Sequence, residues 1–211
     1  MTLAIRPEST VLFIGDSITD AGRDRENPSS LGSGYAAMTA GRFTAEHPGH
    51  RVRFLNRGIG GNRAIDLVSR WDTDCLALKP DVVSIMVGVN DVCRRYDNDD
   101  PTPVADFAER YRRVLTATVD QGASLILLEP FLVPVREQVW DWREDLDPKV
   151  VVVRRMAHEF GATLVATDGL MAQAATASSP AEWSTDGVHP TPAGHALIAG
   201  AWLAAVTAQR D

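Results

Sequence analysis

A serine, an aspartate and a histidine of this chain have the types and spacing that acyl transfer requires. Ser17 follows the apolar run "VLFI" and two further residues, and Asp186 precedes His189 by three positions in "STDGVHPTPAGH". A serine hydroxyl is a weak nucleophile that needs a base, and an imidazole base needs its other nitrogen held in one tautomer. A turn at Gly187 would bring the Asp186 carboxylate to that nitrogen. These residues are therefore the candidate nucleophile, orienting acid and base.

The tetrahedral intermediate of acyl transfer carries an oxyanion, which needs hydrogen-bond donors that are fixed in advance. The candidate donors are the backbone N–H of Ser17, the N–H of a glycine in "GIGG" and the side-chain amide of Asn90 in "GVND". An asparagine amide suits this role because it donates without titrating. Both Gly60 and Gly61 remain candidates on this reasoning.

Five short apolar runs are the elements that must position these residues. Near-continuous apolar strands are typical of a parallel sheet that is covered by helices on both faces. The expected strands are 11–15, 52–58, 81–91, 123–131 and 162–169. Helical periodicity is expected over 35–47, 64–78, 104–122 and 149–161, and in a last helix that Thr191 caps and Pro192 begins.

This alternation predicts an α/β fold, a three-layer αβα sandwich with a five-stranded parallel sheet, as a single domain over residues 1–211. Ligands bind outside the carboxyl ends of such strands, and the candidate residues follow those ends. We therefore expect these residues to lie close together at the edge of the sheet formed by the carboxyl ends of the strands, here called the rim. Two irregular segments, 20–34 and 133–148, are long enough to be functional or to lie at an interface.

Composition narrows the class of protein. The 211 residues are 45% hydrophobic and 23% charged, as in a soluble globular domain, and the net charge of −7 gives no support to binding of nucleic acid or of an anionic membrane. The two cysteines, Cys75 and Cys93, are expected to be free thiols in a reducing compartment. No secretory signal is recognisable, and no apolar run approaches the roughly 18 residues of a membrane span. The expected location is the cytoplasm.

Four motifs, "IGDSIT", "GIGGN", "GVND" and "DGVHP", occur in this order between residues 14 and 190. They resemble the four sequence blocks of the SGNH hydrolases, also called the GDSL esterase/lipase superfamily. The resemblance implies Ser17 as nucleophile, Gly61 and Asn90 as oxyanion donors, and Asp186 and His189 as acid and base. It also implies that no metal and no cofactor take part. The usual "GDSL" is "GDSI" here, which is a conservative departure.

A narrower similarity concerns "LFIGDSITDAGR", "GSGY", "VSIMVGVNDVCRRYD" and "GVHPTPAGH". These segments are similar to bacterial intracellular acetylxylan esterases of the SGNH type, which deacetylate xylo-oligosaccharides. The similarity implies removal of O-acetyl groups from a small acetylated saccharide through an acetyl-enzyme. The alternatives are a thioesterase or lysophospholipase with the same catalytic residues, and a non-catalytic binding module.

Residues beside the motifs also have plainer interpretations. Asp16 is expected to cap the segment after the first strand rather than to act as the triad acid. Together with Arg23, Tyr35 and Trp183 it is also a candidate substrate contact. The "GIGG" segment does not match the nucleotide-binding patterns G-x-G-x-x-G or the P-loop.

Two further groups have competing interpretations. His195, with Asp186 and His189, could ligate a metal, but no second carboxylate–histidine cluster completes such a site. Trp140 and Trp142 alternate, which would seat them on one side of an extended segment, where they could contact a sugar, lie at a subunit interface or have a packing role. The second option leaves formation of a homo-oligomer open.

Overall fold

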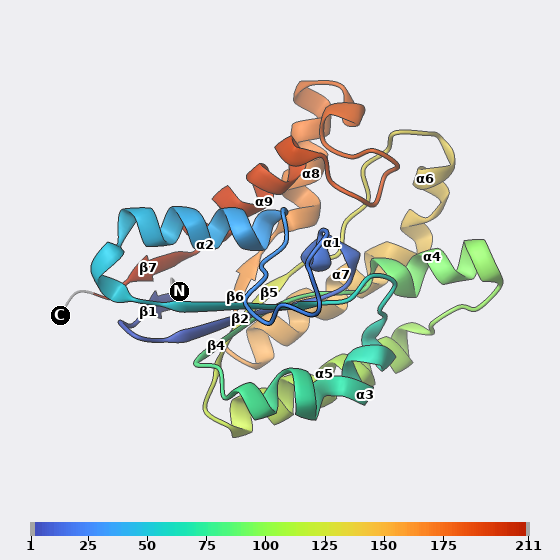
Figure 1. Ribbon diagram of the computed structural model, residues 1–211. Helices are drawn as coiled ribbons and strands as arrows, with labels where there is room; N and C mark the ends of the chain where they lie inside the picture. The colour runs from blue at the N-terminus through green and yellow to red at the C-terminus, as the bar shows by residue number, and fades with distance from the viewer. Residues whose placement is uncertain (1–2, 210–211) are drawn as a thin grey trace.

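A sheet of five parallel strands lies between two layers of helices in the computed structural model, which describes residues 3–209 (Figure 1). This arrangement confirms the expected α/β sandwich. The strands, in their order across the sheet, are β3 (Arg53–Gly58), β2 (Thr10–Gly15), β4 (Val82–Met86), β5 (Ser124–Leu128) and β6 (Thr163–Val165).

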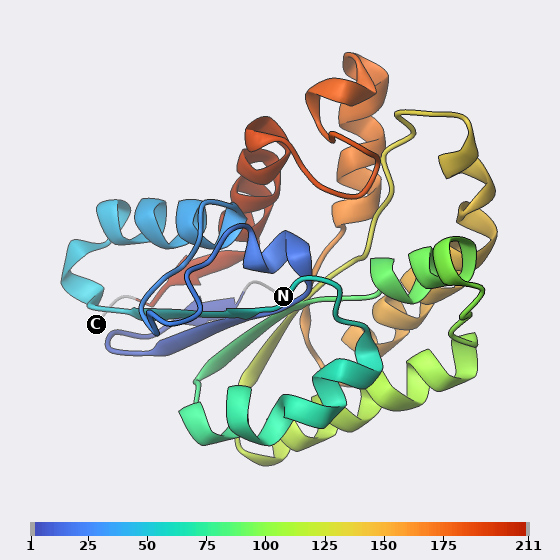
Figure 2. The same cartoon turned by 45° about the vertical axis from the view of Figure 1, so that its right-hand side comes forward.

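Each face of the sheet packs on its own set of helices (Figure 2). One face is covered by α2 (Tyr35–Glu46), α8 (Thr167–Ala177) and α9 (Pro192–Ala204), and the other by α3 (Ala64–Asp74), α5 (Val104–Asp120) and α7 (Arg143–Glu159). Within β2, Phe13 packs in the first core with Trp202, whereas Leu12 packs in the second with Trp71. Successive strand side chains point to opposite faces, so a strand that is apolar throughout is buried on both.

The short helices α1 (Ser17–Asp20) and α4 (Val89–Asn98) follow the carboxyl ends of β2 and β4. A third short helix, α6 (Gln138–Asp141), lies in the segment between β5 and α7. Outside the main sheet, β1 (Leu3–Ile5) pairs in parallel with β7 (Val206–Ala208). This small sheet was not predicted, because three residues are too few to show a period.

The predicted third strand, 81–91, is wrong in its second half. The strand ends at Met86 and the chain turns at Gly88, whose φ of +129° is in the region that favours glycine. Helix α4 then buries Val89, Val92 and Cys93 at helical spacing. Asn90 therefore lies in the first turn of a helix and not on a strand.

The predicted fifth strand, 162–169, is also too long, because α8 begins at Thr167. A tertiary contact stabilises this helix start. The Glu129 side chain accepts the N–H of Asp168 at 3.2 Å, and the Thr167 hydroxyl donates to the Glu129 carbonyl at 2.7 Å. Glu129 is remote in sequence, so the local pattern did not reveal this start.

The segment 133–148 is less irregular than expected. It contains α6 and the first turns of α7, which begins six residues before the predicted start at residue 149. Pro148 lies inside α7, near the helix start, while Leu146 and Lys149 on either side of it are fully buried. Burial of this part of the helix thus outweighs the local effect of the proline.

Cys75 and Cys93 are free thiols, as predicted, and both are buried. Within residues 3–209, no helix combines the length and the apolar character that crossing a bilayer demands.

Gly15 lies at the end of β2, in register with Met86 of the neighbouring strand β4. A Cβ added there would lie 2.0 Å from the carbonyl oxygen of Met86 and 2.8 Å from the Thr19 hydroxyl. No side chain fits this space without moving the backbone of β4, so Gly15 is a packing requirement of the sheet edge that carries Ser17.

We expect Gly15→Ala to lower the free energy of unfolding by about 3 kcal/mol because the added methyl group must displace backbone. Gly41→Ala is the matched control, since Gly41 is exposed on α2 with nothing within 4 Å of its added Cβ. That control should raise stability by about 0.5–1 kcal/mol through helix propensity. Urea denaturation measures both, and equal effects of the two substitutions would contradict the packing argument.

Candidate active site

Ser17, His189 and Asp186 form a continuous hydrogen-bonded chain at the carboxyl end of the sheet. Ser17 Oγ lies 2.9 Å from His189 Nε2, and His189 Nδ1 lies 2.7 Å from Asp186 Oδ2. The side chains of His189 and Asp186 are 50% and 46% exposed, so the chain opens to solvent. With Nδ1–H donating to the carboxylate, Nε2 is free to accept the serine proton.

The loop between Asp186 and His189 is closed on itself by hydrogen bonds. Asp186 Oδ1 accepts the N–H groups of Val188 at 2.9 Å and His189 at 2.8 Å. Gly187 makes the turn with a φ of +100°, as the sequence predicts. Ser184 Oγ accepts the Gly187 N–H and donates to the His189 carbonyl, both at 2.9 Å.

The same bonds keep Asp186 ionised. Partial burial raises its pKa, but the N–H groups of His189 and Val188 and the His189 ring together outweigh burial. The net result is a pKa below the ordinary value for an aspartate. Asp186 is thus a carboxylate that holds the imidazole in place.

Ser17 is the first residue of α1, and only Asp16 separates it from the end of β2. Asp16 is the N-cap residue of this helix, and its Oδ1 accepts the Ile18 N–H at 3.0 Å. The predicted capping role of Asp16 is therefore confirmed. Its side chain points into the protein, and the residue is only 1% exposed.

Burial dominates the electrostatics of Asp16 and raises its pKa to about 7. The Ile18 N–H and the charge of His189 lower the pKa, whereas the neighbouring Asp91 raises it further. A buried carboxyl group without a paired cation disfavours its ionised form. Asp16 thus holds its proton to a much higher pH than an exposed aspartate does.

The glycine turn and Asn90 lie together beside the nucleophile. Asn90 Nδ2 donates one hydrogen to the Asn62 carbonyl at 3.1 Å, which leaves its second hydrogen available. Gly60 donates its N–H to Asp20 Oδ2 at 3.0 Å. Gly61 has a φ of +80°, and its N–H has no acceptor among residues 3–209.

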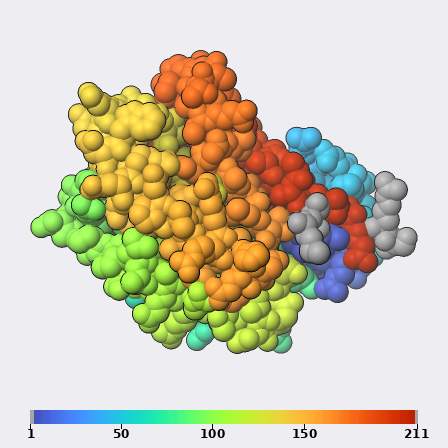
Figure 3. Space-filling view, turned by 180° about the vertical axis from the view of Figure 1, so that it is seen from behind, coloured from blue at the N-terminus to red at the C-terminus, as the bar shows by residue number. Residues whose placement is uncertain are grey.

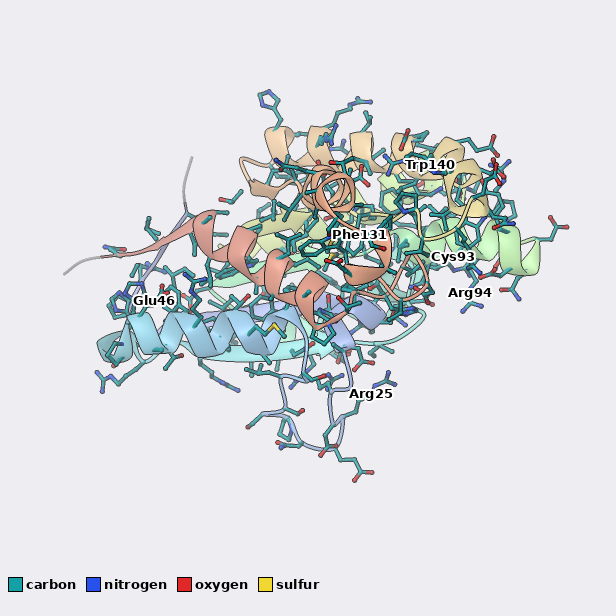
Figure 4. All side chains as sticks on the ribbon, turned by 90° about the horizontal axis from the view of Figure 1, so that it is seen from above. Arg25, Glu46, Cys93, Arg94, Phe131 and Trp140 are labelled. Carbon is teal, nitrogen blue, oxygen red and sulfur yellow. The ribbon has the colours of Figure 1, made fainter. Side chains whose placement is uncertain are left out.

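Arg94 and Arg25 flank this turn. In Figure 4, Arg94 extends from α4 and Arg25 from the loop that follows α1. Their guanidinium nitrogens lie 3.5 Å and 3.9 Å from the positions that Cβ atoms would take on Gly61 and Gly60, respectively. A guanidinium group therefore lies on each side of the turn, and that of Arg25 is paired with the Asp20 carboxylate.

Unlike the triad residues, most of the predicted substrate contacts are buried. Tyr35 is fully buried, and its hydroxyl lies 3.0 Å from the Thr19 hydroxyl. Arg23 is 9% exposed and donates to the Gly58 carbonyl at 2.9 Å. Burial argues against substrate contact for Asp16, Tyr35 and Arg23, whose partners are inside the protein. Trp183 is half-buried, and its Nε1 donates to Ser178 at 2.9 Å.

His195 binds the first residue of α2. Its Nδ1 accepts the N–H of Tyr35, the first residue of α2, at 3.1 Å. Burial lowers the pKa of His195 to about 4, with a smaller contribution from His189, so the ring is neutral at neutral pH. Over the range 3–209, no group of three or more His, Cys, Asp or Glu residues is arranged to hold a metal ion.

The two tryptophans do not lie on one side of an extended segment, so that prediction is wrong. Trp140 is in α6 and is 61% exposed, whereas the Trp142 ring stacks on Tyr96 with their centroids 5.2 Å apart. Trp140, Leu132 and Ala175 help to line a cavity of about 690 Å³ that includes no triad residue. Figure 3 shows the side of the molecule formed by α6, α7 and α8.

Sequence analysis did not predict two residues that fix the backbone at the rim. Asn56 is fully buried and donates to the carbonyls of Thr19 and Leu31. Arg70 donates to the Gly15 carbonyl at 3.0 Å and to the Arg57 carbonyl at 2.8 Å. A polar residue inside an apolar strand was a usable signal for Asn56, whereas Arg70 has the pattern of a solvent-facing helix residue.

Known proteins are similar to this chain in sequence over most of its length. The model of the GDSL-like lipase/acylhydrolase family matches residues 13–197. The chain belongs to this family. It is a carboxylic ester hydrolase with the fold that the SGNH resemblance implied. In sequence it is 37% identical over 201 residues to an acetylxylan esterase from Geobacillus stearothermophilus, covering 92% of this chain and 91% of that protein.

Solved structures are similar to this chain over nearly its whole length. The crystal structure of that esterase, Axe2, superposes with a TM-score of 0.91 at 35% identity over 98% of each chain. A protein from Parabacteroides merdae described as a GDSL-like lipase gives 0.92 at 32% identity, covering 97% of this chain and 98% of that one. LAE5, an α/β hydrolase from the metagenome of Lake Arreo in Spain, gives 0.89 at 33% identity, covering 95% and 96%. Three further Axe2 structures are catalytic mutants with a serine, an aspartate or a histidine replaced by alanine.

The buried Asp16 carboxyl makes stability depend on pH. Because its pKa rises from 3.8 to about 7 on folding, the native state binds more protons than the unfolded state between these values. Stability therefore falls as pH rises through this window, and the full cost is present above pH 7. Asparagine keeps the acceptor for the Ile18 N–H without the charge. We expect Asp16→Asn to stabilise the protein more at pH 8 than at pH 4, by about 3–4 kcal/mol.

Chemical denaturation at the two pH values measures this difference. Asp72→Asn on the exposed side of α3 is the control and should show no comparable difference between pH 4 and pH 8. An Asp16→Asn protein whose gain is the same at both pH values would refute the assigned burial cost.

Proposed function

We propose that this enzyme removes O-acetyl groups from carbohydrate, with acetylated xylo-oligosaccharides as its substrate class. The observation that carries the proposal is the hydrogen-bonded chain from Ser17 through His189 to Asp186. That chain lies beside a glycine turn with an N–H available for an oxyanion.

The reaction begins when His189 Nε2 takes the proton of Ser17 Oγ and the oxygen attacks the acetyl carbonyl carbon. The carbonyl electron pair moves to the oxygen and forms a tetrahedral oxyanion. When this intermediate collapses, the bond to the sugar oxygen breaks and His189 donates its proton to that oxygen. Asp186 stabilises the imidazolium while it carries the proton.

The acetyl-enzyme that remains is hydrolysed by the same groups. His189 takes a proton from water, whose oxygen attacks the acetyl carbon, and the second intermediate releases acetate while the proton returns to Ser17 Oγ. In both steps the proposed oxyanion donors are the N–H groups of Ser17 and Gly61 and the second hydrogen of Asn90 Nδ2. No metal and no cofactor enter these steps.

Support for the acetylated saccharide comes from the acetylxylan esterase relative, which resembles this chain over nearly its full length. Support for the triad comes from the mutants of that relative, which are called catalytic and alter the same three residue types. A thioesterase or lysophospholipase would use the same chemistry on another acyl group. The acyl group therefore has to be tested directly.

We expect Ser17→Ala to lower kcat on an aryl acetate by about 10⁴-fold, because no other group replaces the nucleophile. A fluorophosphonate should label the wild-type protein and not the variant. Ser124→Ala is the control, since Ser124 is exposed at the opposite, amino end of β5. Wild-type turnover by the Ser17→Ala protein would exclude the proposed mechanism.

The substrate class is tested by acetate release from acetylated xylo-oligosaccharides and by a series of aryl esters of increasing acyl length. We expect kcat/KM for the acetyl ester to exceed that for the octanoyl ester by about tenfold or more, since each methylene must find space in the pocket. Preference for the long acyl ester, or for a thioester, would favour the lipid or thioester alternative.

A further inference from the structure

Asp20 connects the helix that presents Ser17 to the turn that carries Gly61. It is the last residue of α1, three positions after Ser17, and it is 8% exposed. Its Oδ2 accepts the Gly60 N–H at 3.0 Å across a separation of forty positions. The nucleophile and the glycine turn are thus joined through one carboxylate.

One arginine hydrogen-bonds to the Asp20 carboxylate, and the charge of a second lies near it. Arg25 Nη2 donates to the same Oδ2 at 2.5 Å, and Arg23 Nε lies 4.0 Å from Oδ1. Arg23 is itself anchored by its bond to the Gly58 carbonyl. Figure 4 shows Arg25 on the loop that follows α1. The carboxylate therefore has a fixed direction toward the turn.

The other side of the turn is anchored independently. The Asn62 N–H bonds to the Ile59 carbonyl at 3.2 Å, and the Asn62 carbonyl accepts from Asn90 Nδ2. Between the two anchors lies the Gly61 peptide. With Gly60 donating to Asp20 and Asn62 donating to Ile59, Gly61 has the N–H that remains for a ligand.

Adjacent glycines need such anchors because they lack the Cβ that restricts backbone angles in other residues. An untethered Gly60–Gly61 turn would sample several orientations of its N–H groups. An oxyanion donor is effective when its direction is fixed before the reaction, so that no reorganisation is needed. A carboxylate that accepts the Gly60 N–H supplies this restraint through a charge-assisted bond.

We propose that Asp20 is a positioning residue of the oxyanion hole: it binds the Gly60 N–H and thereby directs the Gly61 N–H toward the acyl oxygen on Ser17. This inference rests on the proposed serine esterase function. The Asp20 side chain makes no hydrogen bond to Ser17 Oγ, whose partner is His189, so its effect passes through Gly61. Loss of the Asp20 carboxylate therefore destabilises the tetrahedral intermediate and does not weaken binding of the substrate in its ground state.

The test replaces Asp20 and measures kcat and KM on an aryl acetate together with the inhibition constant of phenylboronic acid, which forms a tetrahedral adduct with an active serine. We expect Asp20→Ala to lower kcat by about 10–100-fold with KM changed less than about threefold. The inhibition constant of the boronic acid should rise by a similar factor. Asp20→Asn keeps an acceptor for the Gly60 N–H and should recover most of the loss.

Asp100→Ala is the matched control, because it removes an exposed carboxylate paired to Arg63 at 2.8 Å without a contact to the turn. It should leave kcat and boronic acid binding unchanged. A merely structural Asp20 would lower the melting temperature of its variants while kcat and the inhibition constant stay at wild-type values. That outcome overturns the inference.

The two proposals fail in different ways. A wild-type protein without ester hydrolysis, or with hydrolysis that survives Ser17→Ala, rejects the proposed function. A Ser17-dependent wild type whose Asp20→Ala variant keeps kcat within twofold rejects the role of Asp20 alone. If Asp20→Ala does not fold, Asp20→Ser decides, because its shorter side chain does not reach the Gly60 N–H: a loss of about tenfold in kcat with a matching rise in the boronic acid constant supports the inference, and no change in either overturns it.

Discussion

Direct backbone contact at two glycines is the constraint on which the site depends. A Cβ on Gly15 would lie 2.0 Å from the Met86 carbonyl oxygen, and a Cβ on Gly58 would lie 2.2 Å from the Asp20 backbone nitrogen. Without side chains at these points, α1 rests against the ends of β2 and β3. Ser17 is therefore held by the sheet itself rather than by a flexible loop, which is what a preorganised nucleophile requires.

Buried polar side chains then connect the loops at this rim. Asn56, Arg70 and Asp20 each bond to backbone groups of segments that are remote in sequence. Removing a guanidinium from water is costly, and burial lowers the pKa of Arg70, yet its bonds to Asp74 oppose that shift. A satisfied buried network of this kind is rigid, because each lost bond would leave an unpaired polar group in a medium of low dielectric.

The errors of prediction have a common physical origin. The apolar runs that became β2 and β5 were recognisable because burial on both faces leaves no polar residue after the first position of either strand. The same apolar content in 81–91 and 162–169 concealed a turn at Gly88 and a helix that begins at Thr167. Trp142 packs on Tyr96 of another helix, a contact that alternation of two tryptophans does not reveal.

The sequence by itself determined the layered parallel sheet, the four ordered motifs and the identity of Ser17, Asp186 and His189 as the candidate triad. These depend on residue type and on local period, which the linear chain carries. Only the tertiary structure decided that Asp16 is buried, that Gly60 donates to Asp20, and that the Gly61 N–H remains available. Burial and hydrogen-bond partners are properties of segments brought together from distant parts of the chain, so no local pattern contains them.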